Sequence, residues 1–138
     1  MRFIILVSAL LMVKSVTTAQ ESYLMIGQGG GITGEITAYK IYQNGKVLKG
    51  SGRADINYSF IARIKRHQAK EYFAEAEDCH SETFSRPGNM YYFLYYSQQG
   101  KEIRYTWGET GFSTPDNILT LYRDVIKQVS RLNFKTLK

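Results

Sequence analysis

Near the end of the chain, apolar residues recur every three or four positions, which is the period of an amphipathic helix with one buried face. The recurring positions are Ile118, Leu121, Tyr122, Val125, Ile126, Val129 and Leu132. The segment opens with Thr114, Pro115 and Asp116. A capping hydroxyl, a proline at the first helical position and an acid at the positive end of the dipole are typical of a helix start. A C-terminal helix that begins at Pro115 is therefore predicted.

A second stretch with a helical period follows Asp55. Its apolar positions are Ile56, Phe60, Ile61, Ile64, Tyr72 and Phe73. They predict a helix from about residue 57 to about residue 74. A basic run from Arg63 to Lys70 lies around the rest of this helix. We interpret it as the solvated face, with docking of an acidic surface as the alternative.

Runs rich in β-branched and aromatic residues predict five strands. They cover residues 22–27, 35–43, 46–49, 90–97 and 102–107. Asn44-Gly45, between the second and third strands, predicts a type I′ turn in which both residues take positive φ, and hence an antiparallel hairpin. In the last strand, apolar residues alternate with polar ones, so Trp107 is expected in the core.

The predicted element order is βββαββα, with hairpins and no repeated alternation of strands and helices. This order predicts the α+β class, with a single small domain whose antiparallel sheet of about five strands carries both helices on one face. Residues 79–89 have no apolar period and contain Pro87-Gly88. They predict a loop.

Residues 1–19 have the features of a secretory signal peptide. A basic residue stands at position 2, residues 3–13 form an apolar run, and residues 17–19 are small, as is typical before a cleavage site. The apolar run is about half as long as a membrane-spanning helix needs. The sequence therefore predicts a signal peptide over 1–19 and a single domain over 20–138. It also predicts a periplasmic or secreted location, with no integral membrane segment after cleavage.

The formal net charge is +6, and two of the basic residues lie in the predicted signal peptide. This mild charge does not favour nucleic-acid binding, which usually requires many more basic residues on one face. Cys79 is the only cysteine, which excludes an internal disulfide. The fold must therefore be stabilised by a packed core.

A glycine-rich segment follows the first predicted strand. Gly29-x-Gly31-x-x-Gly34 matches the spacing of the dinucleotide fingerprint. That motif needs a helix N-terminus next, whose free N–H groups bind the pyrophosphate, whereas a strand is predicted here. No cofactor is expected. We interpret the segment as a tight or bulged connection that needs positive φ, and the alternative is a loop that approaches a partner closely. The candidate loop residues are Gly30, Gly31, Ile32, Thr33 and Gly34.

Few residues point to catalysis. Cys79-His80 places a thiol next to an imidazole, but neighbours in a loop seldom face each other, and His67 adds no metal-ligand spacing. A glycosidase needs two facing carboxyl groups in a cleft. The candidate carboxylates are Glu71, Glu75, Glu77, Asp78, Glu82 and Glu109. Such acids are usually solvated, so we expect no catalytic residue and no metal site.

Tyrosine is the clear excess in the composition, with eleven residues. Tyr92 and Tyr96 share one face of their predicted strand, and Tyr91 and Tyr95 share the other. Amphipathic rings are favoured at recognition surfaces, so an exposed pair is a candidate binding surface. The alternative is that these tyrosines are ordinary residues of a half-solvated sheet.

Three features together resemble the emfourin-like proteins, a family of small inhibitors of thermolysin-type metalloproteases. They are a first strand that runs into Gly30-Gly31-Ile32-Thr33-Gly34, the later strand pair MYYFLYYS and EIRYTWG, and a final helix entered through Thr114-Pro115. The family has an aromatic residue where Ile32 stands here, and the Asn44-Gly45 hairpin and the tyrosine-rich strand are further departures from its pattern. The resemblance implies a small α+β fold and protease inhibition.

The predicted function is an exported, non-enzymatic domain that binds another protein in the envelope or outside the cell, with protease inhibition as its specific form. Two alternatives remain. The protein binds a cell-envelope polymer through its tyrosines and basic helix, or it is a small hydrolase that uses Cys79 or a carboxylate pair.

Overall fold

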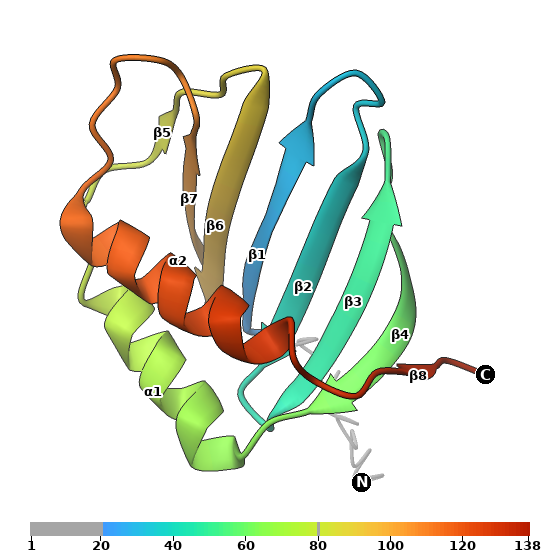
Figure 1. Ribbon diagram of the computed structural model, residues 1–138. Helices are drawn as coiled ribbons and strands as arrows, with labels where there is room; N and C mark the ends of the chain where they lie inside the picture. Colours follow the sequence, from blue (N-terminus) through green and yellow to red (C-terminus); the bar gives the residue numbers. More distant parts are fainter. Residues whose placement is uncertain (1–20, 80) are drawn as a thin grey trace, which may run out of the picture.

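The computed structural model describes residues 21–79 and 81–138, which form one eight-stranded sheet and two helices (Figure 1). The strands are β1 (Tyr23–Gly30), β2 (Ile36–Tyr42), β3 (Lys46–Gly52), β4 (Asn57–Arg63), β5 (Phe84–Ser85), β6 (Met90–Gln98), β7 (Lys101–Trp107) and β8 (Lys135–Thr136). The helices are α1 (Arg66–Glu77) and α2 (Asp116–Val129). The predicted α+β class is confirmed. The predicted number of strands was too low, and the observed order is ββββαβββαβ.

The sheet has the strand order β5-β7-β6-β1-β2-β3-β4-β8, so β1 and β2 lie at its centre. Its neighbours are antiparallel except for β5 and β7, which are parallel and make the sheet mixed. The short strand β5 lies in the segment that was predicted to be only a loop. β5 pairs with β7 because the backbone groups at that edge of β7 would otherwise lack partners. Directly after β5, the Arg86 N–H donates a hydrogen bond of 2.8 Å to the Thr106 carbonyl.

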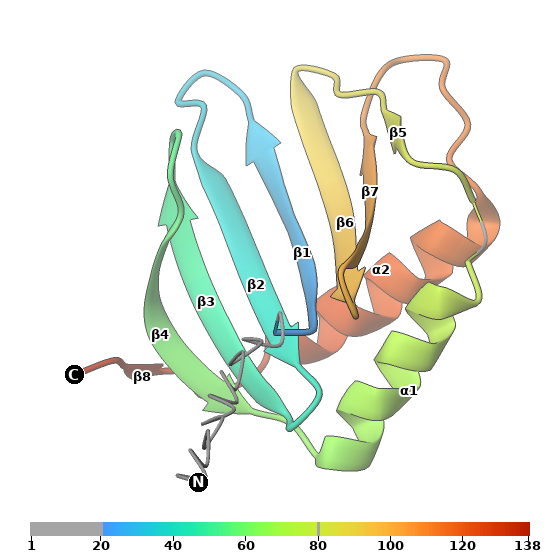
Figure 2. The same cartoon turned by 180° about the vertical axis from the view of Figure 1, so that it is seen from behind.

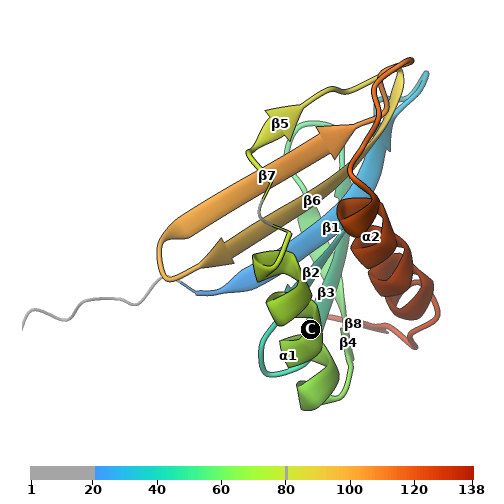
Figure 3. The same cartoon turned by 90° about the vertical axis from the view of Figure 1, so that its left-hand side faces the viewer.

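Both helices pack on the same face of the sheet, which leaves the other face free of helices (Figures 2 and 3). Leu24, Ile26 and Ile41 from the central strands are fully buried beneath them. Trp107 is also buried, and its ring lies 5.1 Å from that of Tyr122 in α2, edge to face. The prediction that Trp107 belongs to the core is confirmed. No helix in the described part of the chain is both long and apolar enough to cross a membrane.

The helix predicted from residue 57 was wrong over its first part, because residues 57–63 form β4 and pair with β3. Phe60 and Ile64 are four positions apart, a spacing that suits a helix face and also suits one face of an alternating strand. A register shift opposite Lys49 and Gly50 adds one extra residue to β4. The extra residue places Tyr58 and Ile61 on one face although they are three positions apart, which imitates a helical period.

The hairpin between β2 and β3 is antiparallel, as predicted, but its turn is not of type I′. Gly45 has a φ of 90°, whereas Asn44 is not among the described non-glycine residues with positive φ. The Gly45 N–H donates to the Tyr42 carbonyl at 3.0 Å. The Asn44 side chain accepts a hydrogen bond of 2.9 Å from the Lys46 N–H. This local hydrogen bond holds the Asn44 side chain although the residue has no positive φ. Of the two turn residues, only Gly45 takes the left-handed conformation.

Helix α2 begins one residue later than predicted. Pro115 is the residue before its first turn, and no side chain caps the helix. Thr114 is buried, and Asp116 supplies the acid in the first turn. Five apolar residues of the predicted stripe are buried against the sheet: Ile118, Leu121, Tyr122, Val125 and Val129.

Candidate functional site

The turn between β1 and β2 is shaped by positive φ angles and backbone hydrogen bonds. Gly30, Gly31 and Gly34 have φ values of 95°, 75° and 64°, which side chains disfavour. The Gly31 N–H donates to the Asn89 carbonyl at 2.8 Å, and the Gly34 N–H donates to the Gly31 carbonyl at 3.3 Å. The predicted connection with positive φ is confirmed. The strand β2 follows it, so the turn does not lead into the helix N-terminus that a dinucleotide site requires.

Ile32 lies in this turn and is fully exposed, at 106% of its reference area. Met90, the first residue of β6, is 46% exposed and pairs with Gly30 in the sheet. A β-carbon built on Gly31 would lie 3.1 Å from the Met90 Sδ atom, so Met90 adjoins the turn. We call residues 30–34 together with Met90 the apolar rim.

The apolar rim holds two of the four large apolar side chains that are exposed in the described part of the chain. The other two, Phe60 and Leu137, lie at the edge formed by β4 and β8. Thr33 supports the turn, because its side-chain oxygen accepts a hydrogen bond of 3.3 Å from the Glu35 N–H. The rim therefore presents apolar surface from a backbone that hydrogen bonds hold in place.

The four tyrosines of β6 divide between the two faces of the sheet. Tyr96 is 3% exposed and belongs to the core, and Tyr92 packs against it, with a ring stacked 6.2 Å from that of Trp107. Tyr91 and Tyr95 alternate with them along β6 and are half-buried on the opposite face, which no helix covers. Of the candidate tyrosines, the structure therefore places only Tyr91 and Tyr95 on an open surface.

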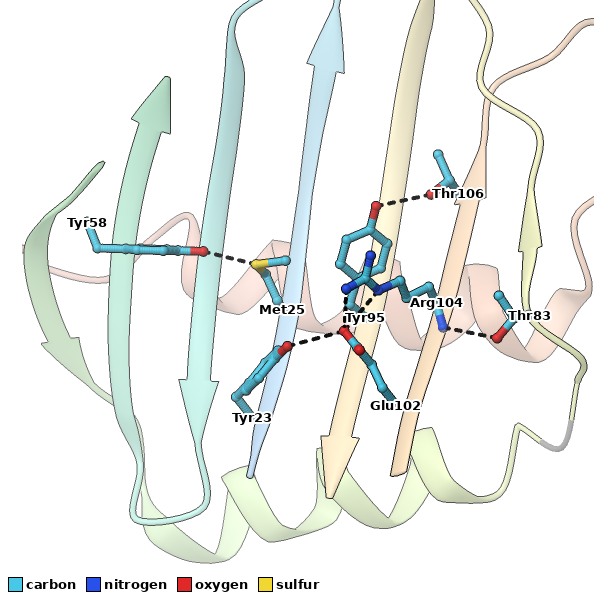
Figure 4. Close-up of polar contacts among 8 residues, drawn as sticks. All are labelled: Tyr23, Met25, Tyr58, Thr83, Tyr95, Glu102, Arg104 and Thr106. Carbon is cyan, nitrogen blue, oxygen red and sulfur yellow. Dashed lines mark hydrogen bonds and ion pairs between the residues drawn. The ribbon is translucent and has the colours of Figure 1, made fainter. Parts of the chain in front are cut away.

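This open surface extends well beyond β6, across six strands (Figure 4). We call it the helix-free face. Its half-buried large side chains include Tyr23, Met25, Tyr58, Tyr91 and Tyr95. Phe93 lies on the same face but is buried beside the rings of Tyr91 and Tyr95. Tyr58 lies across β3 and β2, and its hydroxyl meets the Met25 Sδ atom at 2.9 Å. Sequence reasoning missed this surface outside β6. The sequence of β1 gives no clear signal for it, because Tyr23 and Met25 are nearly as apolar as the core residue Leu24 that they flank.

Glycines in β1 make room for the rings of β6. Gly27 lies opposite Phe93, and Gly29 lies opposite Tyr91. A β-carbon built on Gly27 would lie 2.5 Å from the Phe93 Cζ atom, and one built on Gly29 would lie 2.7 Å from the Tyr91 hydroxyl oxygen. The β6 rings therefore extend over the neighbouring strand, and larger residues at these glycines would clash with them.

Cations of the helix-free face lie over its tyrosine rings. The Lys40 Nζ atom is 4.4 Å from the centre of the Tyr23 ring, and the Lys46 Nζ atom is 4.3 Å from the Tyr42 ring. On the other side of the face, Arg104 lies over Tyr95 at 5.2 Å. Such contacts stabilise a cation by about 0.5–1 kcal/mol at exposed sites. They hold the charged groups close to the aromatic surface.

Glu102 in β7 is an acidic residue of this face. Its carboxylate accepts the Arg104 side chain at 2.7 Å, and the Tyr23 hydroxyl donates to it at 3.5 Å. Glu102, Tyr23 and Lys40 also line a hollow of about 360 Å³ together with Glu21. The hollow therefore carries groups of both charges. Burial raises the pKa of the Tyr58 hydroxyl to about 12, so this hydroxyl remains a hydrogen-bond donor at neutral pH.

Cys79 is buried, and its thiol points at the Glu75 carbonyl at 3.3 Å. Burial, followed by the charges of Glu75 and Asp78, raises the pKa of this thiol. The thiol is therefore protonated at neutral pH and is a poor nucleophile. The other member of the predicted pair, His80, lies outside the described residues. Among residues 21–79 and 81–138, no three His, Cys, Asp or Glu side chains are grouped closely enough to hold a metal ion.

The sheet separates the exposed tyrosines from the basic helix. Tyr91 and Tyr95 lie on the helix-free face, whereas Arg66 and Lys70 belong to α1, which packs on the other face. Arg66 and Lys70 are both exposed. These two groups of residues do not form one continuous surface.

No protein-family model and no curated protein matches this chain. The resemblance to the emfourin-like proteins rests on the residues quoted above and remains a prediction.

Proposed function

We propose that this protein is an exported, non-enzymatic domain that binds another protein through the apolar rim. The observation that carries the proposal is the full exposure of Ile32 in a turn held by hydrogen bonds. A pre-organised turn loses little conformational entropy when a partner binds. Burial of an apolar side chain the size of isoleucine in a partner pocket contributes about 1.5–3 kcal/mol. The proposal that the protein is exported rests on the predicted signal peptide. The proposed partner is a protein of the cell envelope or one outside the cell.

The narrower form of this proposal is the inhibition of a thermolysin-type metalloprotease. Its support is the resemblance carried by residues 30–34, which are also the residues that form the exposed turn. An inhibitor needs a protruding segment that keeps its shape inside the protease cleft. The turn offers one apolar side chain at Ile32, and Met90 beside it extends the contact surface.

The alternatives have weaker support. Polymer binding by tyrosines and the basic helix together requires one surface, but these groups lie on opposite faces of the sheet. Hydrolysis through Cys79 requires a reactive thiolate, but burial raises the pKa of this thiol.

Inhibition of a thermolysin-like protease by the purified protein tests the narrower proposal. We expect inhibition at about micromolar concentration, and at least a tenfold weaker effect for Ile32→Asp with an unchanged melting temperature. Leu137→Asp is the matched control, because Leu137 is also a large exposed apolar residue but lies away from the rim. Complete protease activity at micromolar wild-type protein would remove the inhibitor proposal.

A pull-down from envelope extract and culture medium tests the broader proposal. We expect wild-type protein and Leu137→Asp to capture the same protein, and Ile32→Asp to lose it. Equal capture by all three variants would show that the rim is not the binding site.

A further inference from the structure

From the helix-free face we infer that two copies of this chain form a dimer by packing these faces against each other. The dimer has a two-fold axis parallel to the strands and between β1 and β2. No helix of the described chain covers this face, although it carries four half-buried tyrosines and Met25. Tyrosine is enriched at interaction sites, because its ring buries a large area and its hydroxyl can still form a hydrogen bond.

The charge distribution across the face favours a second copy as the partner. One row of cross-strand neighbours runs from Glu102 through Ser97, Tyr23 and Tyr42 toward Lys46, which pairs with Arg63. The row therefore has a carboxylate at its β7 end, which pairs with Arg104 of the same strand, and two basic residues at its β4 end. In the described chain, no carboxylate lies within ion-pair distance of Lys46 or Arg63.

The two-fold axis reverses this row in the second copy. Glu102 of one copy then faces Arg63 of the other, and the same ion pair forms a second time by symmetry.

The area of the face is sufficient for a dimer. Six strands spaced about 4.8 Å apart, each with about seven residues at a rise of about 3.3 Å, give a footprint of about 650 Å² per copy. Two copies bury about 1,300 Å², which lies within the range of about 1,200–2,000 Å² of specific interfaces. Both sheets then lie inside the assembly, with the helices on its outer surfaces.

Sedimentation equilibrium on the full protein, purified with the N-terminus that the producing cell leaves, tests this inference. We expect a monomer–dimer equilibrium with a dissociation constant in the micromolar range, as for weak interfaces of this size. Glu102→Arg alone and Arg63→Glu alone each place like charges opposite one another, and each is expected to weaken the dimer at least about tenfold.

An equimolar mixture of these two variants is expected to restore the dimer, because the heterodimer regains two pairs of opposite charge. Glu109→Arg is the matched control. Glu109 is also an exposed acid paired with an arginine, Arg86 at 3.2 Å, but it lies outside the helix-free face. This variant is expected to dimerise like the wild type, and circular dichroism checks the fold of every variant.

A protein that stays monomeric up to about 200 µM, well above a micromolar dissociation constant, overturns the inference. A dimer that withstands both charge reversals, or a mixture that does not regain the dimer, also overturns it. Ile32→Asp separates this inference from the proposed function, since it should abolish partner binding and leave the dimer intact.

Discussion

The Tyr122 hydroxyl of α2 donates a buried hydrogen bond of 3.1 Å to the carbonyl of Gly27 in β1. This contact joins residues 95 positions apart, and it ties the helix to the strand that leads into the apolar rim. Gly27 also lies opposite Phe93 of the helix-free face. One position in β1 therefore connects the core, the rim and the open face of the sheet.

Tyr122→Phe is expected to lower the free energy of unfolding by about 1 kcal/mol, because it removes one buried hydrogen bond and leaves the ring in place. Urea denaturation measures the change. Tyr95→Phe is the control, since the Tyr95 hydroxyl makes only a contact of 3.4 Å with Thr106 on the open face, and its change should be smaller. Equal losses would show that the Tyr122 bond has no special role.

Trp107→Ala is expected to lower the free energy of unfolding by about 3–5 kcal/mol, the range for a large aromatic residue removed from a core. Trp107 is 6% exposed and contacts Tyr92 and Tyr122. It is also the only tryptophan in the chain, so fluorescence reports on this site alone. The emission should be blue-shifted in the native protein. Efficient quenching by iodide without unfolding would contradict the buried position.

Gly30→Ala and Gly34→Ala should differ, although both glycines have positive φ. A β-carbon on Gly30 would lie 2.1 Å from the Asn89 carbonyl oxygen, whereas one on Gly34 would meet nothing within 4 Å. We expect a loss of about 1 kcal/mol at Gly34 from the backbone conformation alone, and a clearly larger loss at Gly30. Thermal unfolding of the two variants measures the difference. Equal melting temperatures would show that the turn is looser than described.

Stability should decrease at alkaline pH in a way that depends on Tyr58. Burial raises the pKa of this hydroxyl to about 12 in the folded state, from its ordinary value of 10.0. The folded state thus binds the proton more tightly, and the resulting stabilisation is complete below pH 10 and is lost as the pH rises toward 12. Tyr58→Phe should lose less stability than the wild type over this interval. Parallel curves from urea titrations at several pH values would refute this effect.

Processing is expected at the end of the predicted signal peptide, which gives a mature chain that begins at Gln20 or within a residue or two of it. Intact-mass analysis of the exported protein measures the N-terminus. Recovery of the full chain with Met1, bound to a membrane fraction, would show that the segment is an anchor.

Some elements could be predicted because their sequence patterns allow one interpretation. In α2, Ile118, Leu121 and Val125 recur at a helical period that does not suit the alternation of a strand. In β7, apolar and polar residues alternate around Tyr105, which predicted the face of the strand that is buried. Residues 57–63 could not be assigned in this way. The spacing of Phe60 and Ile64 suits both periods, and the extra residue in β4 depends on pairing with β3.

The candidate surfaces were predictable to different degrees. A glycine-rich connection that needs positive φ could be predicted from the sequence, but which glycines take it and the position of Met90 beside them require the long-range pairing of β1 with β6. The helix-free face depends on the same pairing. Tyr23 and Met25 are nearly as apolar as Leu24 and Ile26, so the pattern alone did not indicate which side of β1 the helices cover.

The outermost strands of the sheet, β5 and β8, have two residues each. A long, uncovered outer strand presents a row of unpaired backbone groups on which further chains can add without limit. Here β8 pairs with the middle of β4, β5 pairs with the end of β7, and Pro87 shortly after β5 has no N–H to donate. Neither β4 nor β7 offers its full length to another chain. The consequence is that open-ended addition of strands from further chains, the first step of fibril growth, is disfavoured.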